Sequence, residues 1–338
     1  MRIVLFGFGT VGQSFARILI KDREWLVKTY GFEPQITTIV DSQGSCNNER
    51  GLDLEQVLKV KKRFGTVRKY PSKGEARKTA SEILSETEAE TMVETMPSNF
   101  KDGEPGLSNI KQALINRKHV VTTDKGPLAL AMSALLELAG HRRLQLRFSG
   151  TVGAGTPFLS FASRCLLGDR ILGIHGILNG TTNYILTRME EGALDFRRAL
   201  AEAQRKGFAE RDPTNDVEGL DTAAKMVIIA NWIVGLRISI HDLPIDGISK
   251  ITPDQIRKAR ASGKSVKLIG RLSERKASVG PEEISLNDPI CVPETLNALT
   301  FSIENAGDVT LIGQGAGGDQ TASAIMRDLV DIRREFSS

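Results

Sequence analysis

Short apolar runs and longer helical patterns alternate along the first 150 residues. Runs of β-branched and apolar residues predict buried strands, and apolar positions repeating every three or four residues predict helices. The predicted strands are Ile3–Phe6, Ile36–Val40, Thr91–Thr95 and His119–Thr123. The predicted helices are Val11–Ile20, Ser108–Asn116 and Leu128–Ala139. This alternation is typical of an α/β domain built on a doubly wound parallel sheet.

The pattern changes near Gly150, where turns of small residues begin to separate the apolar segments. The apolar segments include Leu144–Phe148 and Ile171–Leu178, and further strands are predicted at Glu283–Leu286 and Thr300–Ile303. Helices are predicted at Asn183–Glu191, Phe196–Lys206, Leu220–Val234 and from Thr321 to about Arg334. We therefore expect a second, α+β domain over residues 136–309, with residues 1–135 and 310–338 forming the first. Two charged stretches, Lys59–Lys69 and Lys73–Glu90, are interpreted mainly as solvated excursions between strands.

Composition narrows the class of protein. The 338 residues carry a net charge of +4, which argues against a dedicated nucleic-acid binder. The three cysteines are far apart, which favours reduced thiols in a cytoplasmic protein and disfavours a metal site built on them. We find neither an apolar run of the ~20 residues that span a membrane nor a signal-peptide pattern.

A glycine-rich loop directly follows the first predicted strand. Its sequence, Gly7-Phe8-Gly9-Thr10-Val11-Gly12, fits the pattern G-x-G-x-x-G and leads into a predicted helix. In that context the glycines allow a tight turn, approach of a pyrophosphate to the backbone, and close packing of helix on strand. The loop therefore predicts a Rossmann-like dinucleotide-binding domain.

The choice between NAD and NADP stays open. Asp41 ends the second strand, where a carboxylate would bind the ribose 2′-hydroxyl and favour NAD. Its spacing from Gly12 exceeds the usual ~20 residues. Basic residues nearby could instead meet a 2′-phosphate, although an exposed loop face is the plainer interpretation: Lys59, Lys61, Lys62 and Arg63.

Two further strand ends are candidates to face the nicotinamide, because ligands of such sheets lie beyond the carboxyl ends of the strands. Thr95, Met96 and Pro97 follow one strand, and Thr123 and Lys125 follow another. An ordinary turn would explain either segment, but a lysine directly after a buried strand needs a partner.

A segment rich in carboxylates precedes a buried lysine. Asp221 and Lys225 are four residues apart and share one helix face, and an apolar run follows. Hydride transfer from an alcohol requires a group that takes the hydroxyl proton, and a partly desolvated lysine has the lowered pKa that suits this task. Glu210 and Asp216 are candidates to bind a substrate ammonium group. A surface Asp–Lys pair is the alternative interpretation.

Taken together, these residues resemble those of the homoserine dehydrogenase family. The motifs that carry the resemblance span the chain: Gly7–Gly12, Thr95–Asn99, Thr123–Pro127, Thr151–Pro157, Gly176–Leu186, Gly207–Lys225 and Gly315–Gly318. The resemblance implies reversible hydride transfer between NAD(P) and L-homoserine or L-aspartate 4-semialdehyde, in the biosynthesis of threonine, methionine and isoleucine. It also implies a homodimer formed through the second, substrate-binding domain. No C-terminal regulatory domain is expected.

The resemblance also implies a role for each matched residue. Lys225 matches the catalytic proton donor, with Asp221 and Lys125 as further catalytic candidates. Glu210, Asp221, Gly180 and Thr181 match the substrate pocket, while Gly317 matches a cofactor contact. A monovalent cation, Na⁺ or K⁺, is implied at the backbone carbonyls of Ser149, Val152, Ala154 and Thr156.

Two departures from the family pattern keep alternatives open. Ser149 stands where glutamate is common, and Asp124 stands where asparagine usually precedes the lysine. Another NAD(P)-dependent amino-acid or semialdehyde dehydrogenase would fit these changes. A catalytically silent nucleotide-binding regulator is a third alternative, which the intact set of Glu210, Asp221 and Lys225 argues against.

Overall fold

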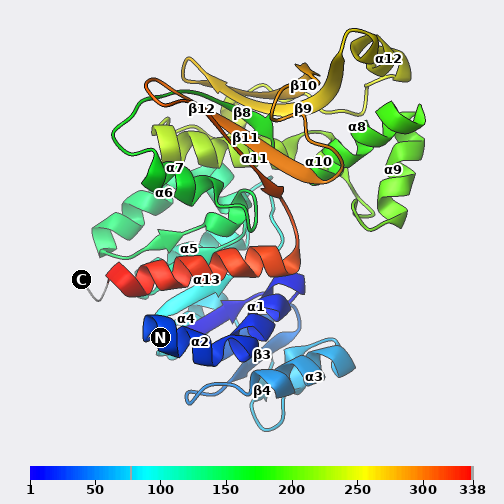
Figure 1. Cartoon of the computed structure of the whole chain (residues 1–338). Helices are drawn as coiled ribbons and strands as arrows, with labels where there is room; N and C mark the ends of the chain where they lie inside the picture. The colour runs from blue at the N-terminus through cyan, green and yellow to red at the C-terminus, as the bar shows by residue number, and fades with distance from the viewer. Residues whose placement is uncertain (77, 336–338) are drawn as a thin grey trace. The chain divides into compact units, whose positions relative to one another are not determined.

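The computed structural model describes residues 1–76 and 78–335 and contains two compact units. The first unit comprises Met1–Gly155 and Gly317–Ser338, and the second comprises Thr156–Ala316. Both are shown in Figure 1. The division falls later than the predicted boundaries, because β7 (Leu146–Arg147) still pairs in the first sheet and β12 (Gly307–Gln314) still pairs in the second. Within the described residues, no helix is long and apolar enough to cross a bilayer.

A seven-stranded sheet forms the centre of the first unit, in the order β4-β3-β2-β1-β5-β6-β7. The five strands from β2 to β7 in this order are parallel, whereas β3 and β4 form an antiparallel edge. This topology confirms the predicted doubly wound α/β fold. The strands other than β7 are β1 (Arg2–Phe6), β2 (Gln35–Asp41), β3 (Gly44–Asn47), β4 (Gly74–Glu75), β5 (Thr91–Glu94) and β6 (His119–Thr122).

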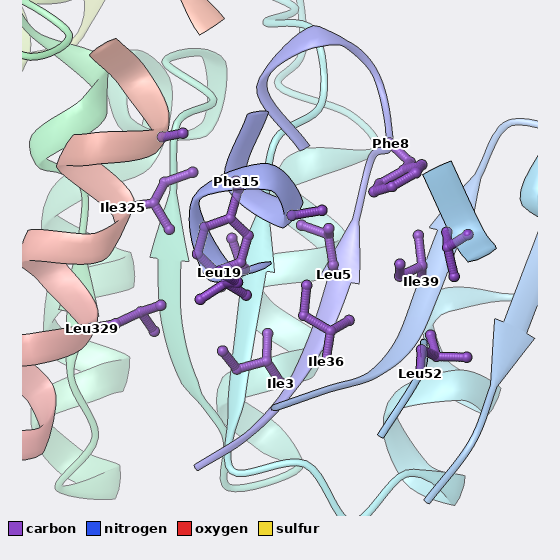
Figure 2. Packing of buried hydrophobic residues seen from close by; sticks show 14 of the residues in the cluster. Ile3, Leu5, Phe8, Phe15, Leu19, Ile36, Ile39, Leu52, Ile325 and Leu329 are labelled. Carbon is purple, nitrogen blue, oxygen red and sulfur yellow. The ribbon is translucent and has the colours of Figure 1, made fainter. Parts of the chain in front are cut away.

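Helices pack on this sheet through apolar faces. In Figure 2, Ile3 and Leu5 of β1 lie between Phe15 and Leu19 of α1 on one side and strand β2 on the other. The helices are α1 (Thr10–Lys21), α2 (Arg23–Tyr30), α3 (Leu54–Phe64), α4 (Ala80–Glu86), α5 (Gly106–Ile115), α6 (Gly126–Arg142) and α13 (Gly318–Glu335). The last helix therefore begins three residues before the predicted start at Thr321.

The stretch Lys59–Lys69 lies between β3 and β4 and is mostly exposed, in agreement with its interpretation as a solvated excursion, but part of it is helical. Most of its first half belongs to α3, which the Asp53 side chain caps by accepting a hydrogen bond from the Gln56 amide. Val57 and Val60 are buried on one side, and the lysines cover the other. The four basic residues between positions 59 and 63 hid a short apolar stripe. The stretch Lys73–Glu90 likewise contains α4.

A five-stranded antiparallel sheet organises the second unit, in the order β10-β9-β8-β11-β12. The remaining strands are β8 (Ile171–Ile177), β9 (Lys264–Ser273), β10 (Lys276–Ser285) and β11 (Leu296–Ile303). Helices α7, α8 and α11 lie on one side of it (Figure 1). Gly270 of β9 leaves room there for α11, since a Cβ at that position would lie 2.5 Å from Met226 Cγ.

The helices of the second unit are α7 (Phe158–Cys165), α8 (Gly180–Gly192), α9 (Phe196–Arg205), α10 (Thr214–Val217), α11 (Leu220–Ile229) and α12 (Pro253–Ala261). The single helix predicted over Leu220–Val234 ends instead in a π-helical turn, Ala230–Val234. Every residue of α11 from Asp221 to Ile229 is buried. Charged side chains on this helix therefore need partners inside the unit.

Candidate functional site

The glycine loop has the geometry of a phosphate site. Gly7 adopts a φ of 91°, and a Cβ there would lie 2.8 Å from the Thr95 carbonyl oxygen. A Cβ at Gly12 would lie 2.5 Å from the carbonyl oxygen of Gly7. At Gly9, by contrast, a Cβ would meet nothing within 4 Å, so the backbone at the start of α1 faces open space. This loop fits a dinucleotide pyrophosphate approaching the amides of a helix N-terminus.

A second glycine run reaches the same loop. A Cβ at Gly318, the first residue of α13, would lie 2.8 Å from Ser14 Oγ and 2.9 Å from Thr10 Cγ2. Gly317, just before it, has a φ of 129° and accepts a hydrogen bond from Thr321 Oγ1. The N-termini of α1 and α13 therefore lie side by side, which is compatible with a cofactor contact at Gly317.

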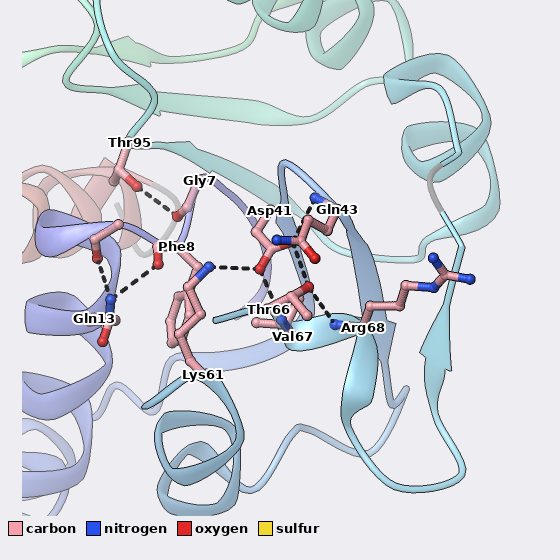
Figure 3. A network of polar contacts seen from close by, with 11 residues as sticks. Gly7, Phe8, Gln13, Asp41, Gln43, Lys61, Thr66, Val67, Arg68 and Thr95 are labelled. Atoms are coloured by element: carbon pink, nitrogen blue, oxygen red, sulfur yellow. Dashed lines mark hydrogen bonds and ion pairs between the residues drawn. The ribbon is translucent and has the colours of Figure 1, made fainter. Parts of the chain in front are cut away.

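Asp41 is fully engaged within the protein (Figure 3). Its Oδ2 accepts from Lys61 Nζ at 2.8 Å and from the Val67 amide at 2.9 Å. Its Oδ1 accepts from Thr66 Oγ1 at 3.1 Å and from the Gln43 amide at 3.0 Å. Burial raises the pKa of Asp41, but Lys61 and the other donors outweigh it, and the pKa is lowered. All four acceptor positions of the carboxylate are occupied.

The two strand ends lie next to each other because β5 and β6 are parallel neighbours. Thr95 donates through Oγ1 to the Gly7 carbonyl at 2.8 Å, which ties this strand end to the glycine loop (Figure 3). Thr123 donates its amide to the Glu94 carbonyl at 3.0 Å. The Lys125 amide donates to Ser98 Oγ at 2.9 Å. The predicted nicotinamide residues thus form one connected edge beside the phosphate loop.

Behind this edge lie two buried carboxyl groups that the sequence did not single out together. Glu94 accepts from Asn109 Nδ2 at 3.2 Å and from Thr122 Oγ1 at 3.1 Å. Asp124 accepts from the Gly126 amide at 2.9 Å. Burial and the charge of Asp124 raise the pKa of Glu94 to about 8, and burial raises the pKa of Asp124 to about 6. Glu94 is therefore neutral at pH 7.

In the second unit, Lys225 lies in a small polar cluster inside an apolar surround. Its ammonium nitrogen is 2.7 Å from Asp221 Oδ2 and donates to the Leu178 carbonyl at 2.6 Å. The two side chains are 8% and 12% exposed, so the alternative of a surface ion pair does not apply. An ammonium has three donors, which leaves one N–H of Lys225 for a further acceptor.

Asn179 is a member of this cluster that sequence reasoning missed. Its Nδ2 donates to Asp216 Oδ1 at 2.6 Å and to Asp221 Oδ2 at 2.9 Å, while its Oδ1 accepts from the Thr182 amide and caps α8. Burial raises the pKa of Asp216, and the nearby charge of Asp221 raises it further. The sequence offered one signal for Asn179, an asparagine directly before a helix. Nothing in the sequence indicated its hydrogen bonds to two carboxylates that lie far away along the chain.

The other predicted substrate residues, Gly180, Thr181 and Glu210, differ in how they lie relative to the Lys225 cluster. A Cβ at Gly180 would lie 2.7 Å from the Thr295 carbonyl oxygen, so α8 begins in close contact with the segment before β11. Thr181 donates through Oγ1 to the Phe208 carbonyl at 2.7 Å, and its side chain also hydrogen-bonds Asp216, which offsets part of the rise in the pKa of that carboxyl and puts Thr181 beside the cluster. Glu210 is exposed, and no hydrogen bond or ion pair joins its carboxylate to Asp221 or Lys225 within the described residues.

The segment predicted to bind a cation begins in a single 3₁₀ turn, Ser149–Thr151. The Ser149 amide donates to Asp328 Oδ2 at 2.9 Å, and burial raises the pKa of that carboxyl to about 6. Val152 is fully buried and Ala154 has a φ of 47°. Among residues 1–76 and 78–335, no cluster of three or more His, Cys, Asp or Glu side chains could hold a metal ion.

Comparison with known proteins agrees with this geometry. The family model described as homoserine dehydrogenase matches residues 157–330, and one described as Glutamate/Leucine/Phenylalanine/Valine dehydrogenase matches residues 1–99. A homoserine dehydrogenase of Methanocaldococcus jannaschii is 42% identical over 332 residues, covering 98% of each chain. An NAD(+)-dependent homoserine dehydrogenase of Pseudomonas canavaninivorans is 36% identical, covering 98% of this chain and 96% of its own.

Among solved structures, a hyperthermophilic archaeal homoserine dehydrogenase in complex with NADPH superposes with a TM-score of 0.87. It is 29% identical, and the match covers 99% of this chain and 98% of that one. The predicted resemblance is thus confirmed over nearly the whole length of the chain. The chain belongs to the homoserine dehydrogenase family.

Proposed function

We propose that this protein is an NAD(P)-dependent oxidoreductase that interconverts L-homoserine and L-aspartate 4-semialdehyde. Two observations support it together: family membership, and the buried ion pair of Lys225 with Asp221 beside the Leu178 carbonyl. The first unit would bind the dinucleotide, and the second would bind the substrate. When bound, the nicotinamide ring would accept or supply the hydride.

The residues around Lys225 account for the proton. Oxidation of the alcohol releases a hydride from carbon and a proton from oxygen, and reduction of the aldehyde needs the reverse. The ammonium donates one N–H to Asp221 and one to Leu178, so its third points to the substrate oxygen in this proposal. Asp221 fixes the direction of the amine and offsets its charge.

The substrate ammonium group would lie against the carboxylates. Asp216 is partly buried, and its pKa is raised by burial and by the charge of Asp221, whereas a bound ammonium group beside it would favour its ionised form. Glu210, with its exposed carboxylate, remains a proposed second contact. Gly180 and Thr181 would line the same pocket.

For the dinucleotide, we propose that both NAD and NADP are accepted. One relative is named an NAD(+)-dependent homoserine dehydrogenase, and another homoserine dehydrogenase was solved in complex with NADPH. In this chain the Asp41 carboxylate already has four donors and a lysine counter-charge. A 2′-hydroxyl would have to displace a donor to bind it, and a 2′-phosphate would meet Lys61 as well as a carboxylate.

The test is the near-ultraviolet absorbance of the reduced dinucleotide, followed with homoserine and each of NAD and NADP. Lys225→Ala should reduce turnover by about 10²–10⁴-fold, because this is the typical contribution of general acid–base catalysis. Dinucleotide binding should persist. Lys118→Met is the control, since Lys118 is equally buried but donates to the carbonyls of Thr87 and Ala89 in the first unit.

Different outcomes would select the alternatives. Turnover of another amino alcohol but not homoserine would favour a related dehydrogenase. Dinucleotide binding with no turnover of any such substrate would favour a nucleotide-binding regulator. Loss of dinucleotide binding in Lys225→Ala would give the lysine a structural role instead.

We further propose that the protein is a homodimer. On the side of the second sheet facing away from α11, His175 of β8 pairs in register with Arg271 of β9, and both are partly exposed. That face carries none of α7, α8 or α11 (Figure 1), and such an open sheet face suits a contact between two copies. Light scattering should give twice the chain mass; a monomer at micromolar concentration would contradict the proposal.

The cation and the compartment complete the proposal. The carbonyls of Ser149, Val152, Ala154 and Thr156 would bind Na⁺ or K⁺, and activity measured with either salt against a tetramethylammonium salt tests this. The described cysteines, Cys46, Cys165 and Cys291, are free thiols, as expected in the reducing cytoplasm where we place the protein.

A further inference from the structure

Asn297, the second residue of β11, carries a buried side-chain amide without a partner. The residue is 0% exposed, and neither Oδ1 nor Nδ2 has a hydrogen-bond partner within the described part of the chain. Buried amides are nearly always hydrogen-bonded, because an unpaired polar atom loses its water and gains nothing in return. An amide with both atoms unpaired therefore points to a group that it bonds in another state of the molecule.

The surroundings of this amide identify the group. A Cβ at Gly315 would lie 1.9 Å from Asn297 Nδ2 and 2.4 Å from Oδ1, so the Gly315 backbone lies directly on the amide. Asn297 also pairs with Gly313, where a Cβ would lie 2.2 Å from Thr156 Oγ1. Thr156 begins the second unit, and Gly315 is its last residue but one. Both ends of the unit thus meet at this amide.

We propose that Asn297 is a positioning residue for the dinucleotide: when the dinucleotide is bound, the side-chain amide hydrogen-bonds the Gly315 backbone, at the start of the Gly315–Gly318 run. A peptide group has one donor and one acceptor, which match the amide's acceptor and donor. The bonds fix the run, and the run includes Gly317, the proposed dinucleotide contact. This inference rests on the proposed function, because it requires that the protein binds NAD or NADP.

Replacing Asn297 by leucine separates this role from a structural one. Leucine branches in the same way but has no polar atoms. Removing two unpaired buried polar atoms should leave the unliganded protein as stable as before or more stable. Removing bonds that form only with the dinucleotide should weaken its binding by about three- to tenfold, as expected for one neutral hydrogen bond. The two effects have opposite signs.

The experiment measures the melting temperature of the unliganded protein and the Kd of NADH and NADPH by their fluorescence. Asn297→Leu should keep or raise the melting temperature and raise Kd, and Asn297→Ala should raise Kd too if the leucine variant fails to fold. Asn231→Leu is the matched control, since both atoms of that amide bond to Ile238. It should lower the melting temperature and leave Kd unchanged.

Unchanged Kd in both Asn297 variants, with a lowered melting temperature, would overturn the inference and assign the amide a structural role. Its failure is distinct from failure of the proposed function. In the first case the wild-type protein binds a dinucleotide as the variants do. In the second the wild-type protein binds neither NADH nor NADPH, and both ideas are refuted.

Discussion

Replacing Glu94 by glutamine should remove a pH-dependent loss of stability. Glu94 is fully buried at the end of β5, with an amide and a hydroxyl as donors and Asp124 as a neighbouring carboxyl. Burial first, and then the charge of Asp124, raises its pKa from 4.5 to about 8. Glutamine keeps the shape of the protonated acid and does not ionise; its Oε1 can accept from Asn109, and its Nε2 can donate to Thr122 Oγ1.

The sign follows from proton binding in the two states. Between pH 4.5 and about 8 the folded protein keeps the Glu94 proton while the unfolded chain has released it. The unfolded state then binds fewer protons, so the free energy of unfolding falls as pH rises through this window. The full displacement corresponds to about 5 kcal/mol, and the part reached by pH 7 to about 3 kcal/mol. Below pH 4.5 the contribution is fully present.

Thermal unfolding followed by circular dichroism between pH 5 and pH 9 measures this effect. For a domain of this size about 1 kcal/mol corresponds to roughly 2–4 °C, so the melting temperature of Glu94→Gln relative to wild type should rise by about 10 °C across the range. The titration of Asp328 is common to both proteins and cancels, and the interaction of Glu94 with Asp124 is already contained in the raised pKa of Glu94. Glu137→Gln, at a carboxylate that is 74% exposed, should follow wild type. Parallel curves for wild type and Glu94→Gln would refute the reasoning.

Two further predictions concern the dinucleotide and the substrate. Lys61→Met should lower the preference for NADP over NAD by about tenfold, because the Asp41 charge is no longer offset where a 2′-phosphate would bind. Lys59→Met, at an exposed position on the same helix, is the control. The same ratio of kcat/KM for NADP to kcat/KM for NAD in both variants would contradict this prediction. Asn179→Ala should raise KM for homoserine and lower kcat by about tenfold, because two carboxylates lose the donor that they share. Steady-state kinetics measures this effect, and the KM for the dinucleotide should stay unaltered. Unchanged kinetics would remove Asn179 from the site.

The sequence predicted the first unit well because its signals are local. Each buried parallel strand is a short apolar run, and the glycine loop follows β1 within a single turn. Helix α3 was missed because Val57 and Val60 are the buried stripe of a segment whose other positions are mostly charged. The edge strands β3 and β4 were missed because they are short and polar.

The sequence predicted only those parts of the candidate site that depend on local signals. Asp221 and Lys225 were expected on one helix face, and a spacing of four residues is enough to bring them together. Asp41 was expected at a strand end, but its engagement by Lys61, Thr66 and Val67 depends on how α3 and the following turn fold back. Contacts between residues about 15 or more positions apart have no local signal, which is why Asn179 and Asn297 were not found.

The burial of the Asp221–Lys225 pair bears on its role. A buried ion pair gains little net stability, because removing two charges from water costs about as much as their attraction returns. Among the described residues, Lys225 donates two of its three N–H groups, and Asp221 shares the Asn179 amide with Asp216, so the cluster is held in place from two sides. Stability alone would favour an apolar replacement at both positions. Catalysis explains the arrangement where stability does not, because the cluster holds the amine rigidly with one donor directed to a substrate oxygen.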